Sequence, residues 1–172
     1  MIYSELLTLE NKIFKNCSLK ITNIISHNES KEYSACSFFL NENRIIFRNA
    51  KITPKKQGQF VTFWKRSESG PIEPYHENDD FDFFIVNCYS ENNAGLFIFP
   101  KLILLQKGVV SSKFKEGKRA FRVYPIWEEA ENKQAIKTQA WQKDYFVLFS
   151  QIIKYETIKK MFSTQYFHHL DL

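Results

Sequence analysis

Glycine, proline and cysteine are all scarce in this sequence of 172 residues, with five, five and three occurrences. The cysteines, Cys17, Cys36 and Cys88, are odd in number and widely spaced, which argues against a disulfide framework and against a zinc site. We expect three buried, reduced thiols, as in a protein of the cytoplasm. The few glycines form neither a phosphate-binding loop nor a dinucleotide-binding fingerprint.

Long hydrophobic runs are also missing. The most apolar stretch, residues 95–105, contains Pro100 and Lys101 and is far too short to span a bilayer. The N-terminal segment MIYSELLTLENK lacks the basic and then apolar pattern of a signal peptide. We therefore expect no membrane association and no cofactor-binding motif of a common type.

Aromatic residues are abundant, with 17 Phe, 8 Tyr and 3 Trp, and the hydrophobic and charged fractions are 44% and 25%. Such a composition is typical of a globular protein and not of a disordered chain. A chain of this length corresponds to about one domain and can bury a sizeable core. The sequence thus predicts a single domain over residues 1–172.

Hydrophobic periodicity divides the chain into three parts. Residues 1–28 show helical spacing of apolar side chains, at Leu6, Leu9, Ile13, Cys17, Ile21 and Ile24. Short β-branched and aromatic runs then predict strands at 34–40, 44–53, 58–66, 81–89, 95–105 and 119–125. Residues 133–153 return to a helical period, and 154–172 could form a further helix. This order predicts an α+β fold, with a mixed or antiparallel sheet of about five to six strands flanked by N- and C-terminal helices.

Turn-forming residues separate the predicted strands. Asn41 to Asn43 predict a short hairpin turn, and Pro54 to Gly58 a second reversal. Residues 67–80, which include two further prolines and an acidic cluster, are predicted to form a loop.

Charge is segregated along the chain. Residues 44–66 contain seven Lys or Arg and no acid, 67–94 contain seven acids and no Lys or Arg, and 95–125 contain seven Lys or Arg against Glu116 alone. Two interpretations remain open. The basic strands could form ion pairs with the acidic stretch inside the protein, or they could face outward as a groove that binds an anion.

The second interpretation gives a set of candidate residues for binding phosphate or nucleic acid. Basic side chains follow phosphates, aromatic rings stack on bases, and the planar fork of Arg suits phosphate oxygens. The candidates are Lys51, Lys55, Gln59, Trp64, Lys65, Arg66, Lys118, Arg119 and Arg122.

Several runs within residues 30–150 resemble the MepB family in order and spacing. They are ACSFFL (35–40), FRNAKITPKKQGQFVTFWKR (47–66), GPIEPY (70–75), FIFPK (97–101), KEGKRAFRVYP (115–125) and KQAIKTQAWQKDYF (133–146). The resemblance implies a bacterial, cytosolic protein, from a family whose founding member is encoded beside a multidrug efflux pump. It also implies a fold related to the restriction-endonuclease-like superfamily, whose active members hold a metal with carboxylates beside a lysine.

The residues needed for such metal-dependent cleavage are mostly absent. An active member requires a carboxylate two residues before a lysine, but Asn49 precedes Lys51 and Phe63 precedes Lys65 in this way. Within the matching runs only Glu116 has the required spacing, to Lys118, and Glu32 or Asp82 could supply an earlier acid. These three acids are weak metal-ligand candidates, and we expect a degenerate relative that keeps the groove without the chemistry.

The sequence therefore predicts a nucleic-acid-binding protein with a basic groove and without catalytic activity or a cofactor. The alternatives are an enzyme or binder for a small anionic or phosphorylated ligand, a metal-dependent nuclease, and a protein-interaction module that uses the acidic loop. A small-ligand site requires a deep pocket, and an interaction module requires an exposed apolar patch.

Overall fold

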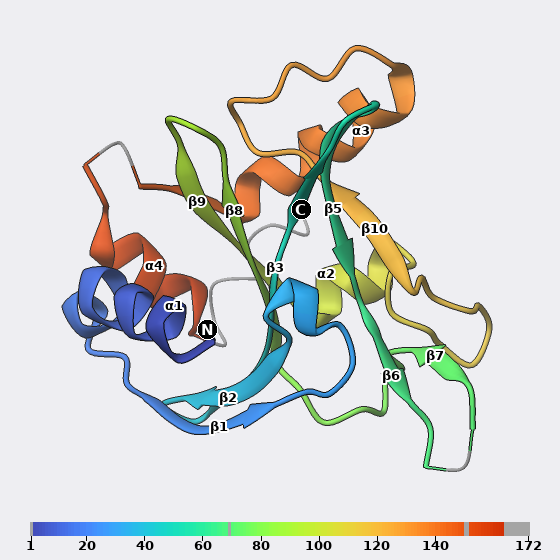
Figure 1. Ribbon diagram of the computed structural model, residues 1–172, viewed down its shortest axis with the longest axis horizontal. Helices are drawn as coiled ribbons and strands as arrows, with labels where there is room; N and C mark the ends of the chain where they lie inside the picture. The colour runs from blue at the N-terminus through green and yellow to red at the C-terminus, as the bar shows by residue number, and fades with distance from the viewer. Residues whose placement is uncertain (1, 69, 150–151, 164–172) are drawn as a thin grey trace.

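The computed structural model describes residues 2–68, 70–149 and 152–163, and its centre is a six-stranded sheet (Figure 1). The order is β1-β2-β3-β8-β9-β11, and all neighbours are antiparallel except β3 and β8, which are parallel. The strands are β1 (Ile21–Ser26), β2 (Cys36–Leu40), β3 (Asn43–Asn49), β8 (Phe83–Tyr89), β9 (Ala94–Pro100) and β11 (Phe146–Leu148). This sheet confirms the predicted α+β class and the mixed sheet of about six strands.

Helices from the two ends of the chain cover one face of this sheet, as predicted (Figure 1). These segments are α1 (Ile2–Leu9), a π-helical turn (Glu10–Phe14), a 3-10 turn (Lys15–Cys17) and α4 (Tyr155–Met161). Their apolar side chains form one core cluster with the sheet, in which Leu6 and Met161 lie with Phe47 and Ile85.

A smaller sheet and two helices cover the opposite face. The elements are β4 (Lys51–Thr53), β5 (Lys56–Thr62), β10 (Ala120–Val123), α2 (Lys101–Gln106) and α3 (Lys133–Gln142). The small sheet has the order β10-β5-β4, and a separate ribbon pairs β6 (Trp64–Arg66) with β7 (Ile72–Pro74). The buried ring of Phe63 joins the layers, because it stacks on Phe84 with ring centroids 4.2 Å apart and on Tyr75 at 4.6 Å.

Two predicted turns are confirmed. Asn41, with a φ of 53°, turns β2 into β3, and Leu40 pairs with Asn43. The second reversal lies between Thr53 and Lys56, which pair across the β4–β5 hairpin. Between the two turns the chain leaves the large sheet at buried Ala50 and continues into the small one.

The predicted N-terminal helix is wrong beyond Cys17, because Ile21 and Ile24 lie in β1. The cause is a β-bulge between Thr22 and Ile25, where Asn23 has a φ of 53°. The extra residue of a bulge breaks the two-residue alternation of a strand. Ile21 and Ile24 are therefore both partly buried at a spacing of three, which imitates a helix.

Other element boundaries also need correction. The apolar run 95–105 is a strand only as far as Pro100, after which the chain turns into α2. The predicted helix 133–153 ends at Gln142, followed by a 3-10 turn (Lys143–Tyr145) and by β11. Phe63 interrupts the predicted strand 58–66, and β7 lies within the predicted loop 67–80. Helix α4 occupies the start of the predicted tail helix, and residues 164–172 lie outside the described residues.

The three cysteines are buried and unpaired. Burial raises the pKa of Cys17 to about 11 and that of Cys36 to about 12, so both are neutral thiols. Within the described residues, no helix is long and apolar enough to cross a membrane.

Candidate anion-binding site

Part of the predicted basic surface is neutralised by acids of the same chain. Lys65 lies 2.6 Å from Asp79 and 3.3 Å from Glu73, and Arg119 lies 2.8 Å from Glu116. Burial lowers the pKa of Lys65, but hydrogen bonds and charge from Asp79 and Glu73 outweigh it and raise that pKa. The interpretation of ion pairing with the acidic stretch 67–94 therefore describes Lys65, whereas Arg119 pairs with Glu116, outside that stretch.

These residues line a pocket of about 610 Å³ whose charges are mixed. Its walls also include His76 and Ser111. Carboxylates beside each cation reduce the attraction that this pocket offers to a phosphate.

Trp64 and Arg66 lie together on the β6–β7 ribbon. The guanidinium of Arg66 is 6.0 Å from the centroid of the Trp64 ring, and its Nε is 3.5 Å from Glu29. One side of the partly buried Trp64 ring is therefore occupied by Arg66.

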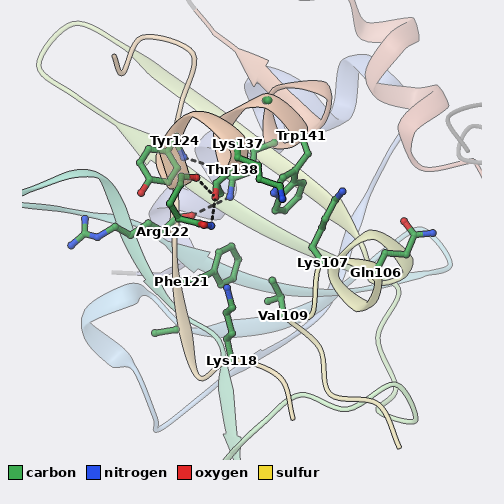
Figure 2. Close-up of a pocket in the computed structure, with 14 residues that line it drawn as sticks. Gln106, Lys107, Val109, Lys118, Phe121, Arg122, Tyr124, Lys137, Thr138 and Trp141 are labelled. Carbon is green, nitrogen blue, oxygen red and sulfur yellow. Dashed lines mark hydrogen bonds between the residues drawn. The ribbon is translucent and has the colours of Figure 1, made fainter. Parts of the chain in front are cut away.

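Arg122 holds the β4–β5 hairpin. Its Nη1 donates a hydrogen bond to Gly58 O at 2.9 Å, and Nη2 donates to Thr53 Oγ1 at 2.8 Å. Figure 2 shows the side chain pointing away from the neighbouring pocket. We assign Arg122 a role in holding this hairpin, because both of its Nη atoms are already engaged.

Gln59 lies in the interior, contrary to its predicted place on a surface. Its side chain is completely buried, and Nε2 donates to Tyr89 O at 2.9 Å. The alternation along β5 explains this position, because Gln59 and buried Val61 lie on the same side of the strand.

The two remaining candidate cations from residues 44–66 lie elsewhere on the small sheet. Lys51 is partly exposed on β4, with Nζ 4.6 Å from the ring centroid of Tyr33. Lys55 is exposed at the turn of the β4–β5 hairpin. Neither lines either of the two pockets described here.

A larger pocket, of about 780 Å³, opens between β10, α2 and α3 (Figure 2). Lys107, Lys118 and Lys137 are exposed at its rim, and Phe121 and Trp141 form part of its aromatic floor. We call this the lysine-rimmed pocket. The other lining residues are Gln106, Val109, Ala120, Arg122, Tyr124, Gln134, Thr138, Ala140 and Gln142.

Helix α3 supplies one wall of the lysine-rimmed pocket. The side chain of Asn132 caps the helix by accepting a hydrogen bond from Ala135 N at 2.9 Å. Lys137 and Trp141 are four residues apart and so lie on one side of the helix. Across the pocket, Lys107 Nζ lies 5.8 Å from the centroid of the Trp141 ring, which places a cation above an aromatic surface.

Gln142 fixes α3 against β10. Its buried side chain accepts a hydrogen bond from Tyr124 N at 2.8 Å and donates one to Arg122 O at 3.1 Å. These groups lie along the edge of β10 that faces away from β5, so the side chain replaces a neighbouring strand. The pocket wall is therefore held in place by buried hydrogen bonds.

The charge of the lysine-rimmed pocket has a single sign. None of its lining residues, all within the described part of the chain, is Asp or Glu, and none of its three rim lysines has an ion pair there. Three unpaired ammonium groups around an aromatic floor can bind phosphate oxygens and a flat ring together.

The weak metal-ligand candidates do not come together. Asp82 accepts a hydrogen bond from Arg44 N at 2.7 Å, Glu116 pairs with Arg119, and Glu32 is exposed in a 3-10 turn. Across the described ranges, no three His, Cys, Asp or Glu side chains are grouped so that they could hold a metal ion. These residues do not fit the carboxylate site that the suspected superfamily uses.

Sequence reasoning found Lys118 but missed Lys107, Lys137 and Trp141 as site residues. The sequence does contain a pattern that indicates the α3 wall of the pocket. Along this helix one face is formed by Gln134, Lys137, Thr138 and Trp141. Lys107 is the C-cap of α2, just beyond the stretch 95–105 that the sequence predicts as a strand.

Comparison with known proteins agrees with this fold. The model of the MepB-like family matches residues 27–148. The crystal structure of MepB has a TM-score of 0.76 and 32% sequence identity, over 87% of this chain and 98% of that one. A bacterial homing endonuclease covers 81% of this chain and 84% of its own, with 11% identity and a TM-score of 0.43, which is too low to support an argument. No curated protein matches the sequence significantly. The family match and the similarity to MepB show that this chain belongs to the MepB-like family.

Proposed function

We propose that the protein binds nucleic acid, without cleaving it, through the lysine-rimmed pocket. The observation that carries this proposal is the absence of Asp and Glu among the residues that line this pocket, which instead has Lys107, Lys118 and Lys137 at its rim. Ammonium groups of one sign around a concave surface attract phosphates and displace their counterions. Metal-assisted hydrolysis would need carboxylate ligands, which the lining does not supply.

The aromatic floor supports single strands over duplexes as the preferred form. Phe121 and Trp141 are both partly exposed, and each can present a ring face to an unpaired base. In a duplex the faces of the bases are already covered by their neighbours. In the proposed binding mode, the three lysines therefore bind phosphates and one base stacks on the aromatic floor of the pocket.

A small phosphorylated ligand is the second candidate. A volume of about 780 Å³ lies within the usual range for small-molecule sites, which is about 300–1,000 Å³. A nucleotide could place its ring on Trp141 and its phosphates on the rim lysines. Such a nucleotide is chemically one unit of a nucleic acid, so the test must compare the affinities of ligands of different length.

The test measures binding of fluorescent single-stranded oligonucleotides of increasing length, together with a labelled mononucleotide, at ~50 mM salt. The variants are Lys118→Gln and Lys137→Gln, and the control is Lys12→Gln, on the helical side of the large sheet. We expect affinity to rise with length, to fall in both pocket variants, and to stay unchanged in the control.

Mononucleotide binding as tight as that of the longest strand would favour the small ligand. Equal binding by the pocket variants, the control and the unmodified protein would contradict the proposed site. Thermal melting of each variant checks that the fold is retained.

A further inference from the structure

We infer that Phe114 is a second contact for nucleic acid, at which the phenyl ring stacks on an unpaired base. This inference rests on the proposed function and adds a separate element to it, outside the lysine-rimmed pocket. Phe114 is 85% exposed, far more than most phenylalanines of a folded protein. It stands between two exposed lysines, Lys113 and Lys115.

The turn that carries this ring is held in shape. Ser112 N donates to Lys115 O at 2.9 Å, and Phe114 N donates to Ser112 Oγ at 3.2 Å. The turn is also tied to the body of the protein, since Lys113 N donates to Glu77 Oε1 at 2.9 Å. An exposed ring on a fixed turn loses little conformational freedom when it binds.

Gly117 fixes the other side of this turn. A Cβ at Gly117 would lie 2.4 Å from Val109 O and 2.6 Å from Ser111 N, so only glycine allows the two segments to approach this closely. Gly117 N also donates to Ser111 Oγ at 2.8 Å. The position of Phe114 is thus determined by packing at the base of the turn.

The surroundings of the ring favour an anionic partner with flat groups. Lys113 Nζ lies 4.7 Å from the ring centroid. The ammonium of Lys115 lies beside Gly108, 3.0 Å from the position that a Cβ would take there. Gly108 directly follows Lys107 of the lysine-rimmed pocket, so Lys115 continues the basic rim toward the turn. Of the two acids at this turn, Glu116 is paired with Arg119, and Glu77 accepts the hydrogen bond from Lys113 N.

The spacing between the two contacts suits a short strand. Phe114 and Lys118 are four residues apart, which spans at most about 14 Å of extended chain. Phosphates of a stacked helical strand repeat every ~3.4 Å along the axis, so the two contacts are at most about four stacked nucleotides apart. A strand with phosphates at Lys118 can therefore bring a nearby base to Phe114.

A membrane surface is the competing partner, because a phenylalanine between two lysines can also insert among anionic lipids. The single ring and the adjoining pocket, with its own aromatic floor, favour a nucleic acid. Vesicles of equal parts phosphatidylcholine and phosphatidylserine serve as the second arm of the test.

The experiment compares Phe114→Ala, Phe114→Leu and Phe114→Trp with Ile152→Ala, which truncates an apolar side chain that is 93% exposed. Binding is measured on a single strand containing 2-aminopurine and on the corresponding duplex. Stacking on one base corresponds to a loss of affinity of about 5- to 150-fold. We expect that loss for the single strand in Phe114→Ala and Phe114→Leu. Phe114→Trp and Ile152→Ala should bind the single strand with near-normal affinity. All variants should bind the duplex about as the unmodified protein does.

If Phe114→Ala binds the single strand normally while Lys118→Gln does not, this inference fails and the proposed function stands. If the unmodified protein binds no nucleic acid at ~50 mM salt, the proposed function fails and the inference fails with it. Loss of vesicle binding in Phe114→Ala without any effect on the single strand overturns the inference in favour of a membrane contact.

Discussion

Nη2 of Arg48 lies 3.2 Å from Nδ1 of His27, so the imidazole accepts a hydrogen bond from a guanidinium. Arg48 is buried in β3, where it also donates to Phe47 O at 2.7 Å and interacts with Tyr75. Nε2 of His27 lies 3.1 Å from Ser37 Oγ, to which it can donate. This arrangement requires a neutral imidazole, because a proton on Nδ1 would face the guanidinium.

Stability should therefore decrease in mild acid. Burial, and then the charge of Arg48, lower the pKa of His27 from 6.5 to about 4, although Glu29 opposes the change. Between these two values the unfolded chain binds a proton that the folded protein does not, so unfolding becomes easier as the pH falls from about 6.5 toward 4. Urea unfolding at a series of pH values measures this dependence.

His27→Gln provides the control for this prediction, because its amide oxygen can still accept from Arg48 and cannot titrate. The decrease between pH 6.5 and 4 should be smaller in this variant. Equal decreases in both proteins would show that His27 titrates normally in the folded state.

Replacement of Gln142 should destabilise the wall of the lysine-rimmed pocket. Gln142→Leu leaves Tyr124 N and Arg122 O without their partner. An unsatisfied buried polar group costs about 1–3 kcal/mol, and we expect a loss of that order in the free energy of unfolding. Gln134→Leu, at an exposed position on the same helix, should change it little. Equal stabilities of the two variants would mean that Gln142 does not hold α3.

Gly117→Ala should disturb the segment that leads to Lys118. The added methyl group would overlap Val109 O and Ser111 N, both of them backbone atoms that cannot move aside alone. We expect lower thermal stability and weaker nucleic-acid binding. Gly70→Ala is the matched substitution, since its nearest neighbour would be Ser67 Oγ at 3.6 Å. Normal melting of Gly117→Ala would show that the turn can shift at little cost.

The sequence predicted the fold class well because periodicity and turn chemistry are local. The Asn41 turn and the terminal helices follow from a few neighbouring residues. The prediction was wrong where contacts between distant segments determine the secondary structure. At β1 a bulge imitates helical spacing. β11 forms only because residues 146–148 pair with β9. An isolated segment contains no information about either pairing.

The site was harder to predict for a related reason. Segregated charge indicated cations near one another, but could not show which of them had acidic partners. Lys65 and Arg119 have such partners, whereas Lys118 has no ion pair among the described residues. The pocket itself arises where α2, β10 and α3 meet, and these three elements are separated from one another in the sequence by loops.

Salt dependence of binding tests the central claim most directly. The measurement is the slope of log K against log salt for a single-stranded oligonucleotide, in the unmodified protein and in a variant with Lys107→Gln, Lys118→Gln and Lys137→Gln combined. Each phosphate contact on a single strand contributes about −0.7 to this slope. We predict that the triple variant has a slope shallower by about two units. The same slope in both proteins would contradict a phosphate-binding role for the lysine-rimmed pocket.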